Sequence, residues 1–265
     1  MKKLSILAIG FVAIALAACG GKKVDQAENT AAEKSFEQEQ IEASIKVHVD
    51  SIAAELGQLK QLPFIQEGST FSLTKEEKQV KPEYLLSPAV ADEATTLAEK
   101  YRVLSALSVD KKLAALYEMP TEDYDKAIAK LSADINDPSF KVIETAGDIF
   151  ETTSALYDAM NENGRINHFW QLASSALIEQ LYAINQNSDK FLSVFDDKAA
   201  SNVSYRIVLI LDAVKRLSEY DPDIKPVSEA LASLESLNAS TVDELKSQMA
   251  EAKDKIEAAR KALIK

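Results

Sequence analysis

Apolar residues recur at intervals of three and four along most of this chain, which is the spacing of one face of an α-helix. The pattern therefore predicts an all-α fold, an antiparallel bundle of about eight to nine helices. No unit repeats convincingly along the chain, which favours a bundle over a solenoid. Helices are predicted over 33–61, from Ser87-Pro88 onward, over 122–134, from Asp137-Pro138 onward, from Gly164 to about 186, and over 189–196, 201–219, 223–237 and 242–263.

Short polar signals mark where several of these helices begin. Ser87 followed by Pro88 is a typical start, because serine caps free N–H groups and proline fits the first turn. Ser108 is placed to cap a second piece of the same helical region. Thr241 and Glu244 have the spacing of a capping box at the start of the last helix.

Three patterns predict how the helices pack. Residues 201–219 are apolar on nearly all sides in the middle, so this helix is expected at the centre of the bundle. An apolar seam with heptad spacing runs through 242–263, which predicts one unbroken helix packed at a shallow angle on another. Gly147 lies in an apolar stripe with Ile143 and Phe150, where it is expected to permit a close helix approach.

Residues 63–87 are the least helical stretch and are interpreted as an irregular insertion in a single helical domain that spans 33–265. The stretch is long for a loop in a compact domain, and long loops are often functional. Its Phe71 and Tyr84, together with His168 and Trp170 from the start of a later helix, are the residues expected to form an interaction surface.

The charge balance narrows the classes of partner. The chain has 265 residues and a net charge of −12, and it is rich in helix-forming residues, with only seven glycines. Two of its 30 basic residues, Lys2 and Lys3, precede residue 19, so the chain from residue 19 onward carries a charge of −14. An acidic surface repels phosphate backbones, and nucleic acid is therefore not expected as a partner.

The first residues have the pattern of a secretory signal. Lys2 and Lys3 are followed by the apolar run 4–18, which is too short to span a membrane. The run ends in Leu16-Ala17-Ala18-Cys19, and Cys19 is the only cysteine of the chain. This segment resembles the lipobox of bacterial lipoproteins, the site of signal peptidase II.

The resemblance implies that 1–18 is a removed signal peptide and that Cys19 carries a diacylglycerol thioether and an N-acyl chain. Two or more acyl chains anchor a protein stably to a membrane. Residues 19–32 are polar and small, and they are interpreted as a flexible tether. Gly20 follows the cysteine in place of an aspartate, which favours the outer membrane, facing the periplasm or the cell surface.

Motifs for catalysis or metal binding are weak. Residues 72–75 and 108–111 share the S-x-x-K spacing of penicillin-recognising enzymes, but the chain has no K-T-G or S-D-N triplet. The loop at Gly164 has the glycine of an EF-hand, but Ala159 and Trp170 stand where carboxylates are needed, so Gly164 is interpreted as a helix cap. His48 lies on the apolar stripe of its helix and outside any metal-binding motif.

No cofactor and no metal are expected. The leading hypothesis is a non-enzymatic cell-envelope lipoprotein with a binding or scaffolding role, which has an envelope protein as its possible partner. The alternative is a helical protein that binds a small ligand or a metal in a pocket between helices. An enzyme is the third hypothesis, and it requires buried carboxylates from distant helices that face one another in a cleft.

Overall fold

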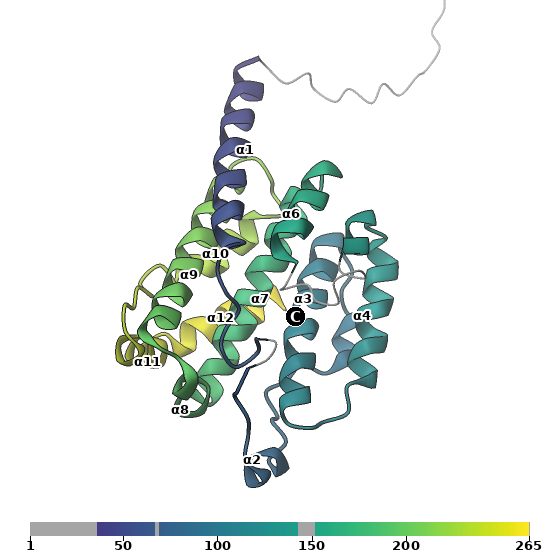
Figure 1. Ribbon diagram of the computed structural model, residues 1–265. Helices are drawn as coiled ribbons and strands as arrows, with labels where there is room; N and C mark the ends of the chain where they lie inside the picture. Colours follow the sequence, from purple (N-terminus) through teal and green to yellow (C-terminus); the bar gives the residue numbers. More distant parts are fainter. Residues whose placement is uncertain (1–35, 67–68, 143–151, 265) are drawn as a thin grey trace, which may run out of the picture.

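The computed structural model describes residues 36–66, 69–142 and 152–264, and within these ranges the regular structure is entirely helical (Figure 1). The predicted all-α bundle is confirmed. Its α-helices are α1 (Phe36–Leu56), α2 (Lys75–Gln79), α3 (Leu97–Leu116), α4 (Glu122–Ile135), α6 (Thr153–Glu162), α7 (Ile166–Gln186), α8 (Ser188–Phe191), α9 (Asp197–Leu217), α10 (Lys225–Ala232), α11 (Val242–Glu251) and α12 (Lys253–Leu263). Three 3-10 turns accompany them: η1 (Pro88–Asp92), η2 (Pro138–Phe140) and η3 (Leu192–Val194).

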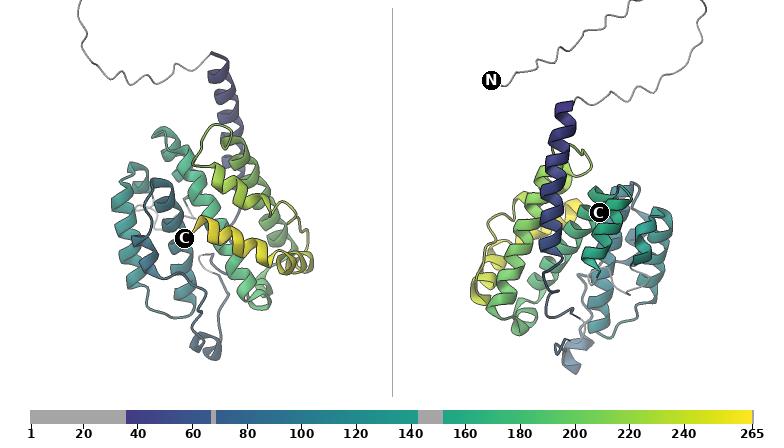
Figure 2. Two further views of the ribbon diagram at one scale, coloured as in Figure 1. Left: turned by 180° about the vertical axis from the view of Figure 1, so that it is seen from behind. Right: turned by 45° about the horizontal axis from the view of Figure 1, so that its top comes forward.

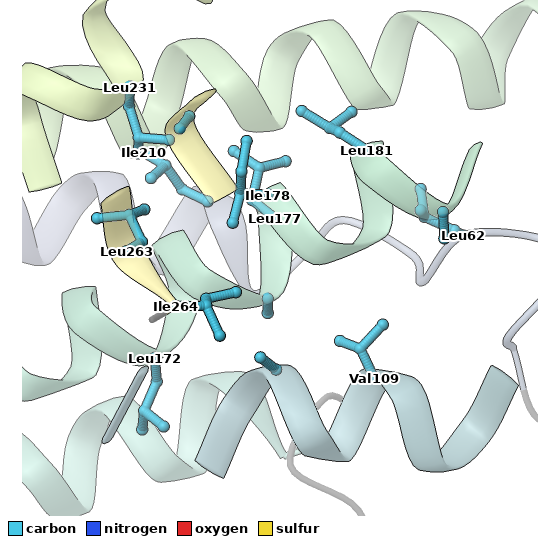
Figure 3. Close-up of a cluster of buried hydrophobic side chains, with 14 of the residues drawn as sticks. Leu62, Val109, Leu172, Leu177, Ile178, Leu181, Ile210, Leu231, Leu263 and Ile264 are labelled. Carbon is cyan, nitrogen blue, oxygen red and sulfur yellow. The ribbon is translucent and has the colours of Figure 1, made fainter. Parts of the chain in front are cut away.

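The central helix is α7, which contacts α3, α6, α9, α10, α11 and α12. Its leucines and isoleucines meet apolar side chains from helices on several sides (Figure 3). Those labelled in the figure include Leu172, Leu177, Ile178 and Leu181 from α7, Val109 from α3, Ile210 from α9, Leu231 from α10 and Leu263 from α12. The core is therefore organised around α7.

The prediction that 201–219 forms the central helix is wrong. Helix α9 covers this stretch, but it leaves Tyr205 and Val208 exposed. Helix α7 carries a single acid, Glu179, and its Ser175 hydrogen-bonds to backbone inside the core. Ser175 Oγ donates to the Arg102 carbonyl at 2.7 Å, and Ser105 Oγ of α3 donates to the Leu172 carbonyl at 2.8 Å. Small hydroxyls satisfied in this way can be buried at little cost.

The unbroken helix predicted over 242–263 divides at Ala252 into α11 and α12. The predicted seam is nevertheless buried on both pieces, including Leu245 and Met249 before the break and Ile256 after it. The break lets the two pieces pack on different partners, because α11 contacts α9 while α12 contacts α10, and both contact α7. Thr241 caps α11 as expected, since its hydroxyl accepts from the Glu244 N–H.

The helix predicted to start at Pro88 is also two pieces. Ser87 caps η1 as expected, but η1 ends at Asp92 and α3 begins after Thr96, which forms a capping box with Glu99. Ser108 starts no helix: it lies inside α3, where its hydroxyl donates to the Leu104 carbonyl at 2.8 Å. A serine within a helix satisfies its hydroxyl on the preceding turn in this way.

The segment 63–87 is partly helical and packs against the bundle. Thr74 and Glu77 form a capping box at the start of α2, within the stretch predicted to be irregular. Phe64 lies against the rings of Phe71, Phe191 and Phe195, with centroids 4.6 to 6.3 Å away. These aromatic contacts bind the segment to α8 and η3.

Helix α1 projects beyond the other helices at its N-terminal end (Figures 1 and 2). Val49, Ile52 and Leu56 are buried on the C-terminal part of α1, whereas Ile41 and Val47 are exposed. The sequence places His48 on the apolar stripe of its helix, but the structure does not bury it there. It is exposed, and its Nε2 lies 2.9 Å from Asp212 Oδ2 on α9.

The cap predicted at Gly164 is confirmed. Its φ of +67° is left-handed, and the Arg165 N–H donates to the Met160 carbonyl at 2.7 Å across the end of α6. Ile143, Gly147 and Phe150 of the predicted stripe lie outside the described residues, as do Cys19, the signal segment and the tether.

Candidate functional site

The main candidate site is a pocket between α1, α6, α7 and α9, which also touches α3. It encloses about 610 Å³ when its open mouth is counted, and about 70 Å³ of this space admits the centre of a water molecule. This smaller volume corresponds to about five water molecules, so the pocket suits a slender group. Its apolar walls include Leu56, Leu156, Phe169, Leu172, Leu177 and Ile210.

Helix periodicity places one charged side chain in this apolar wall. Arg206 precedes Ile210 by one helical turn on α9, and both line the pocket. The Arg206 guanidinium donates from Nη2 to the Lys60 carbonyl at 2.7 Å and from Nη1 to Gln180 Oε1 at 3.4 Å. Both acceptors are neutral, and no carboxylate pairs with Arg206 in the described part of the chain.

The electrostatics of Arg206 follow from this environment. Burial alone lowers the pKa of Arg206 to about 10, with no acidic neighbour acting against it. A guanidinium with that pKa remains charged at neutral pH. The pocket therefore holds a half-buried positive charge that has no counter-ion among the residues described.

Gln61 adds a second donor at the pocket. Its Oε1 accepts from Lys112 Nζ at 3.4 Å, while its Nε2 is buried and has no hydrogen-bond partner among the described residues. A buried amide N–H without an acceptor is unfavourable, because the free energy lost on desolvation is not offset by a hydrogen bond. An acceptor supplied by a ligand would form that hydrogen bond.

A more polar hollow adjoins the pocket. It encloses about 660 Å³ including its open side, and Gln61 lines both spaces. Lys60 and Lys198 also line this hollow, and neither forms an ion pair with any residue of the described ranges. Its one acid, Asp196, is engaged as the cap of α9, where Oδ1 accepts from the Ala199 N–H at 2.7 Å.

A separate cluster of charges lies buried between α3, α7 and α12. Arg260 donates from Nε and Nη2 to the two carboxylate oxygens of Glu179, each at 2.7 Å, and its guanidinium lies 4.1 Å from the Tyr182 ring centroid. Asp110 adds a second buried acid, which interacts with Glu179. Two acids thus share one guanidinium.

This arrangement keeps a proton on Asp110. Burial and the adjacent Glu179 raise the pKa of Asp110 well above its ordinary range. Burial also raises the pKa of Glu179, but the two hydrogen bonds from Arg260 oppose the shift and favour its ionised form. One proton between the two acids therefore resides on Asp110.

The cluster holds the end of the 63–87 segment in place. Asp110 Oδ2 accepts from the Leu86 N–H at 2.7 Å, Arg260 Nη2 donates to the Tyr84 carbonyl at 3.2 Å, and the Tyr124 hydroxyl donates to the Leu86 carbonyl at 2.8 Å. Buried acids that face one another were the feature expected of an enzyme. Here they line neither of the two spaces described above: Glu179 is engaged by the Arg260 side chain, and Asp110 accepts from the Leu86 backbone N–H.

The four residues predicted to form one interaction surface are not brought together. Phe71 and Trp170 are buried in the core, so they cannot contribute to an exposed surface. Tyr84 is half-buried against Tyr182, and His168 stacks on Tyr101 with ring centroids 4.6 Å apart. Aromatic side chains near the start of a helix are more easily buried than exposed, because burial removes a large apolar area from water.

The two S-x-x-K motifs lie in structural surroundings that differ from those of a catalytic serine and lysine. The Ser108 hydroxyl is used within α3, as described above, and Lys111 pairs with Asp125 at 2.5 Å. In the other motif, Thr74 caps α2 next to Lys75. Neither motif assembles a serine activated by its lysine.

Sequence reasoning missed Arg206, Glu179 and Arg260 as site residues. Two of them carry a usable signal, because Arg206 and Glu179 are single charges within apolar runs of their helices. A charge in such a position must find a partner or face a ligand. Arg260 carries no such signal, since α12 is rich in charged residues.

Comparison with protein-family models, with curated proteins and with solved structures finds no match to this chain. None of the described helices is long and apolar enough to cross a membrane. The residues with described positions also contain no group of three or more His, Cys, Asp or Glu side chains arranged to hold a metal ion.

Proposed function

We propose that this protein is a non-enzymatic binding protein of the cell envelope, anchored by a lipid at Cys19, which takes a small ligand into the pocket between α1, α6, α7 and α9. The observation that carries the proposal is Arg206, a charged side chain in an apolar pocket with only neutral partners among the residues described. Structural arginines are normally paired with acids when they are buried. An unpaired one that lines a pocket is the pattern of a ligand-binding group.

Binding without catalysis fits the chemistry of the pocket. Its polar side chains are amides, hydroxyls and one guanidinium, and its described lining has no acid, histidine or cysteine to act as base or nucleophile. A few polar groups on apolar walls are typical of sites that orient and hold a ligand. The lipid anchor would keep this pocket close to a membrane surface.

The experiment is a titration of the chain from residue 19 onward carrying Cys19→Ser, which lacks both the apolar signal segment and the expected lipidation and so needs no detergent. The probes are 1-octanol and octanoate, followed by calorimetry. Ala173 lines the pocket, and Ala173→Phe is designed to fill it. The matched control is Ala115→Phe, which places the same ring on the exposed side of α3.

We expect at least one probe to bind the parent and the control but not Ala173→Phe. Thermal unfolding of each variant checks that the fold is intact, and a bound probe should raise the unfolding temperature. Absence of binding by both probes to the folded parent would overturn the pocket-binding proposal.

A scaffolding role is the second candidate, and exposed apolar side chains favour it. Val47 on α1 is 71% exposed, and Val208 on the neighbouring α9 is 49% exposed. Crosslinking in intact cells tests this role by comparing the native chain with Val47→Glu. A protein captured at equal stoichiometry by the native chain and lost from Val47→Glu would support a scaffold, whereas identical captures would exclude Val47 from the contact.

A further inference from the structure

We infer that the ligand is an amphiphile with one slender apolar chain and one anionic head group, and that Arg206 and Gln61 bind the head group. The inference rests on the proposed pocket-binding function and adds the chemical class of the ligand. It draws on the unpaired charge of Arg206, the free amide of Gln61 and the junction of an apolar space with a basic one.

The sign of the head group follows from Arg206. Its guanidinium offers more N–H donors than its bonds to Lys60 and Gln180 use. Because a desolvated cation is costly without a counter-ion, an anion gains the most by binding beside it. A neutral or cationic head group would leave that cost in place.

The preference of the site for an anion contrasts with the negative net charge of the whole protein. The whole chain carries −12, so its average field repels anions. That field is screened beyond about 8 Å at physiological salt. Within that distance the residues that count are those of the site, where Arg206 and two lysines outnumber the single Asp196.

The shape of the ligand's apolar chain follows from the apolar pocket. Leucine, isoleucine, alanine and phenylalanine side chains form most of its walls, and the space open inside them is about 70 Å³. A single unbranched alkyl chain suits a space of this volume, whereas a ring system would require the walls to move. The apolar end of the ligand is therefore placed among Leu156, Phe169 and Leu172.

Gln61 marks where chain and head group meet. It lines both the apolar pocket and the polar hollow, and its buried Nε2 lacks an acceptor within the described residues. Lys60 also joins the two spaces, because its carbonyl accepts from Arg206 while the residue itself lines the hollow. An acid group at this junction would accept from Gln61 and Arg206, and larger head groups would extend toward Lys198.

The test uses ligands that differ only in the head group. Octanoate, octyl phosphate and 1-octanol each have one unbranched eight-carbon skeleton. Each is titrated into the protein from residue 19 onward carrying Cys19→Ser, and into the same protein with Arg206→Gln or with Lys215→Gln. Lys215 is an exposed lysine of the same helix, so Lys215→Gln removes one positive charge from α9 away from the pocket lining.

We expect the parent to bind one of the two anions about tenfold or more tightly than 1-octanol, which is the advantage of a charge-assisted hydrogen bond. Arg206→Gln should abolish that preference while 1-octanol binds as before, and Lys215→Gln should retain it. Preference for octyl phosphate indicates a single-chain lipid phosphate, such as a lysophospholipid, and preference for octanoate indicates a fatty acid.

Two results overturn the inference in different ways. Equal affinity for 1-octanol and both anions would mean that the pocket binds ligands without discriminating by head-group charge. The proposal that the pocket binds a ligand would then stand, and the inference that the ligand is anionic would be overturned. An anion preference that persists in a folded Arg206→Gln protein would assign recognition to other residues. Absence of binding by all three probes would overturn the pocket itself.

Discussion

Arg260 donates two hydrogen bonds to the carboxylate of Glu179, each at 2.7 Å, although 81 positions separate the two residues in sequence. Glu179 is fully buried, and the pair joins the central helix α7 to the last helix, α12. The same guanidinium reaches the Tyr84 carbonyl, so the pair also holds the segment that precedes η1. The stability of this region therefore depends on which acids of the cluster are ionised.

Glu179→Gln should destabilise the protein by about 3 kcal/mol, because it leaves the half-buried guanidinium of Arg260 without its counter-ion. Urea unfolding at pH 7 measures the change. The double variant Glu179→Gln/Arg260→Met removes both charges and should recover part of the loss. A double variant no more stable than Glu179→Gln would show that the uncompensated charge is not the cause.

Asp110→Asn should become more favourable as pH rises. The raised pKa of Asp110 means that its contribution to stability is complete at acidic pH, below the ordinary aspartate pKa of about 4, and is lost as pH rises through the folded-state value. An asparagine keeps an acceptor for the Leu86 N–H, but it does not titrate.

The measurement is the difference in unfolding free energy between Asp110→Asn and the parent, taken from pH 4 to pH 8. We expect the difference to shift in favour of the variant across this range. Asp92→Asn, which changes an exposed aspartate paired with Lys130, is the control and should show little of this trend. A difference that is constant with pH would mean that Asp110 is ionised in the folded protein.

Ser175→Leu should destabilise the contact between α3 and α7 by about 3 kcal/mol, because the larger side chain separates two helices that approach closely. Ser175→Ala should cost about 1 kcal/mol, the value of its lost hydrogen bond to the Arg102 carbonyl. Ser201→Leu on the exposed face of α9 is the matched control and should be nearly neutral. Urea unfolding separates the three, and equal effects at positions 175 and 201 would contradict the close packing.

Cys19→Ser, expressed with an ordinary cleavable secretory signal in place of 1–18, should move the protein from the membrane fraction to the soluble fraction of cells, since acyl chains on Cys19 are the proposed anchor. Mass spectrometry of the native chain should show a lipid on residue 19 and no residues before it. Cell fractionation followed by immunoblotting measures the first effect. Retention of Cys19→Ser in the membrane fraction after a salt wash would point to a different means of attachment.

Local features of the fold follow from the sequence alone. The helical class, the extent of α4 and α7, and the caps at Ser87, Thr241 and Gly164 agree with the predictions. These features depend on residues within one or two helical turns, where periodicity and capping hydrogen bonds act. The proposed anchor at Cys19 is likewise a property of a short contiguous segment.

The tertiary structure decided which helix is central, where the last helix breaks and which charges meet. Helix α7 is central because Ser175 and Glu179 find partners on α3 and α12, and no pattern within α7 reveals those partners. The pocket arises in the same way, since Gln61, Gln180 and Arg206 come from three separate parts of the chain. Contacts between distant residues depend on how whole helix faces pack, and sequence periodicity describes each face without specifying the face that opposes it.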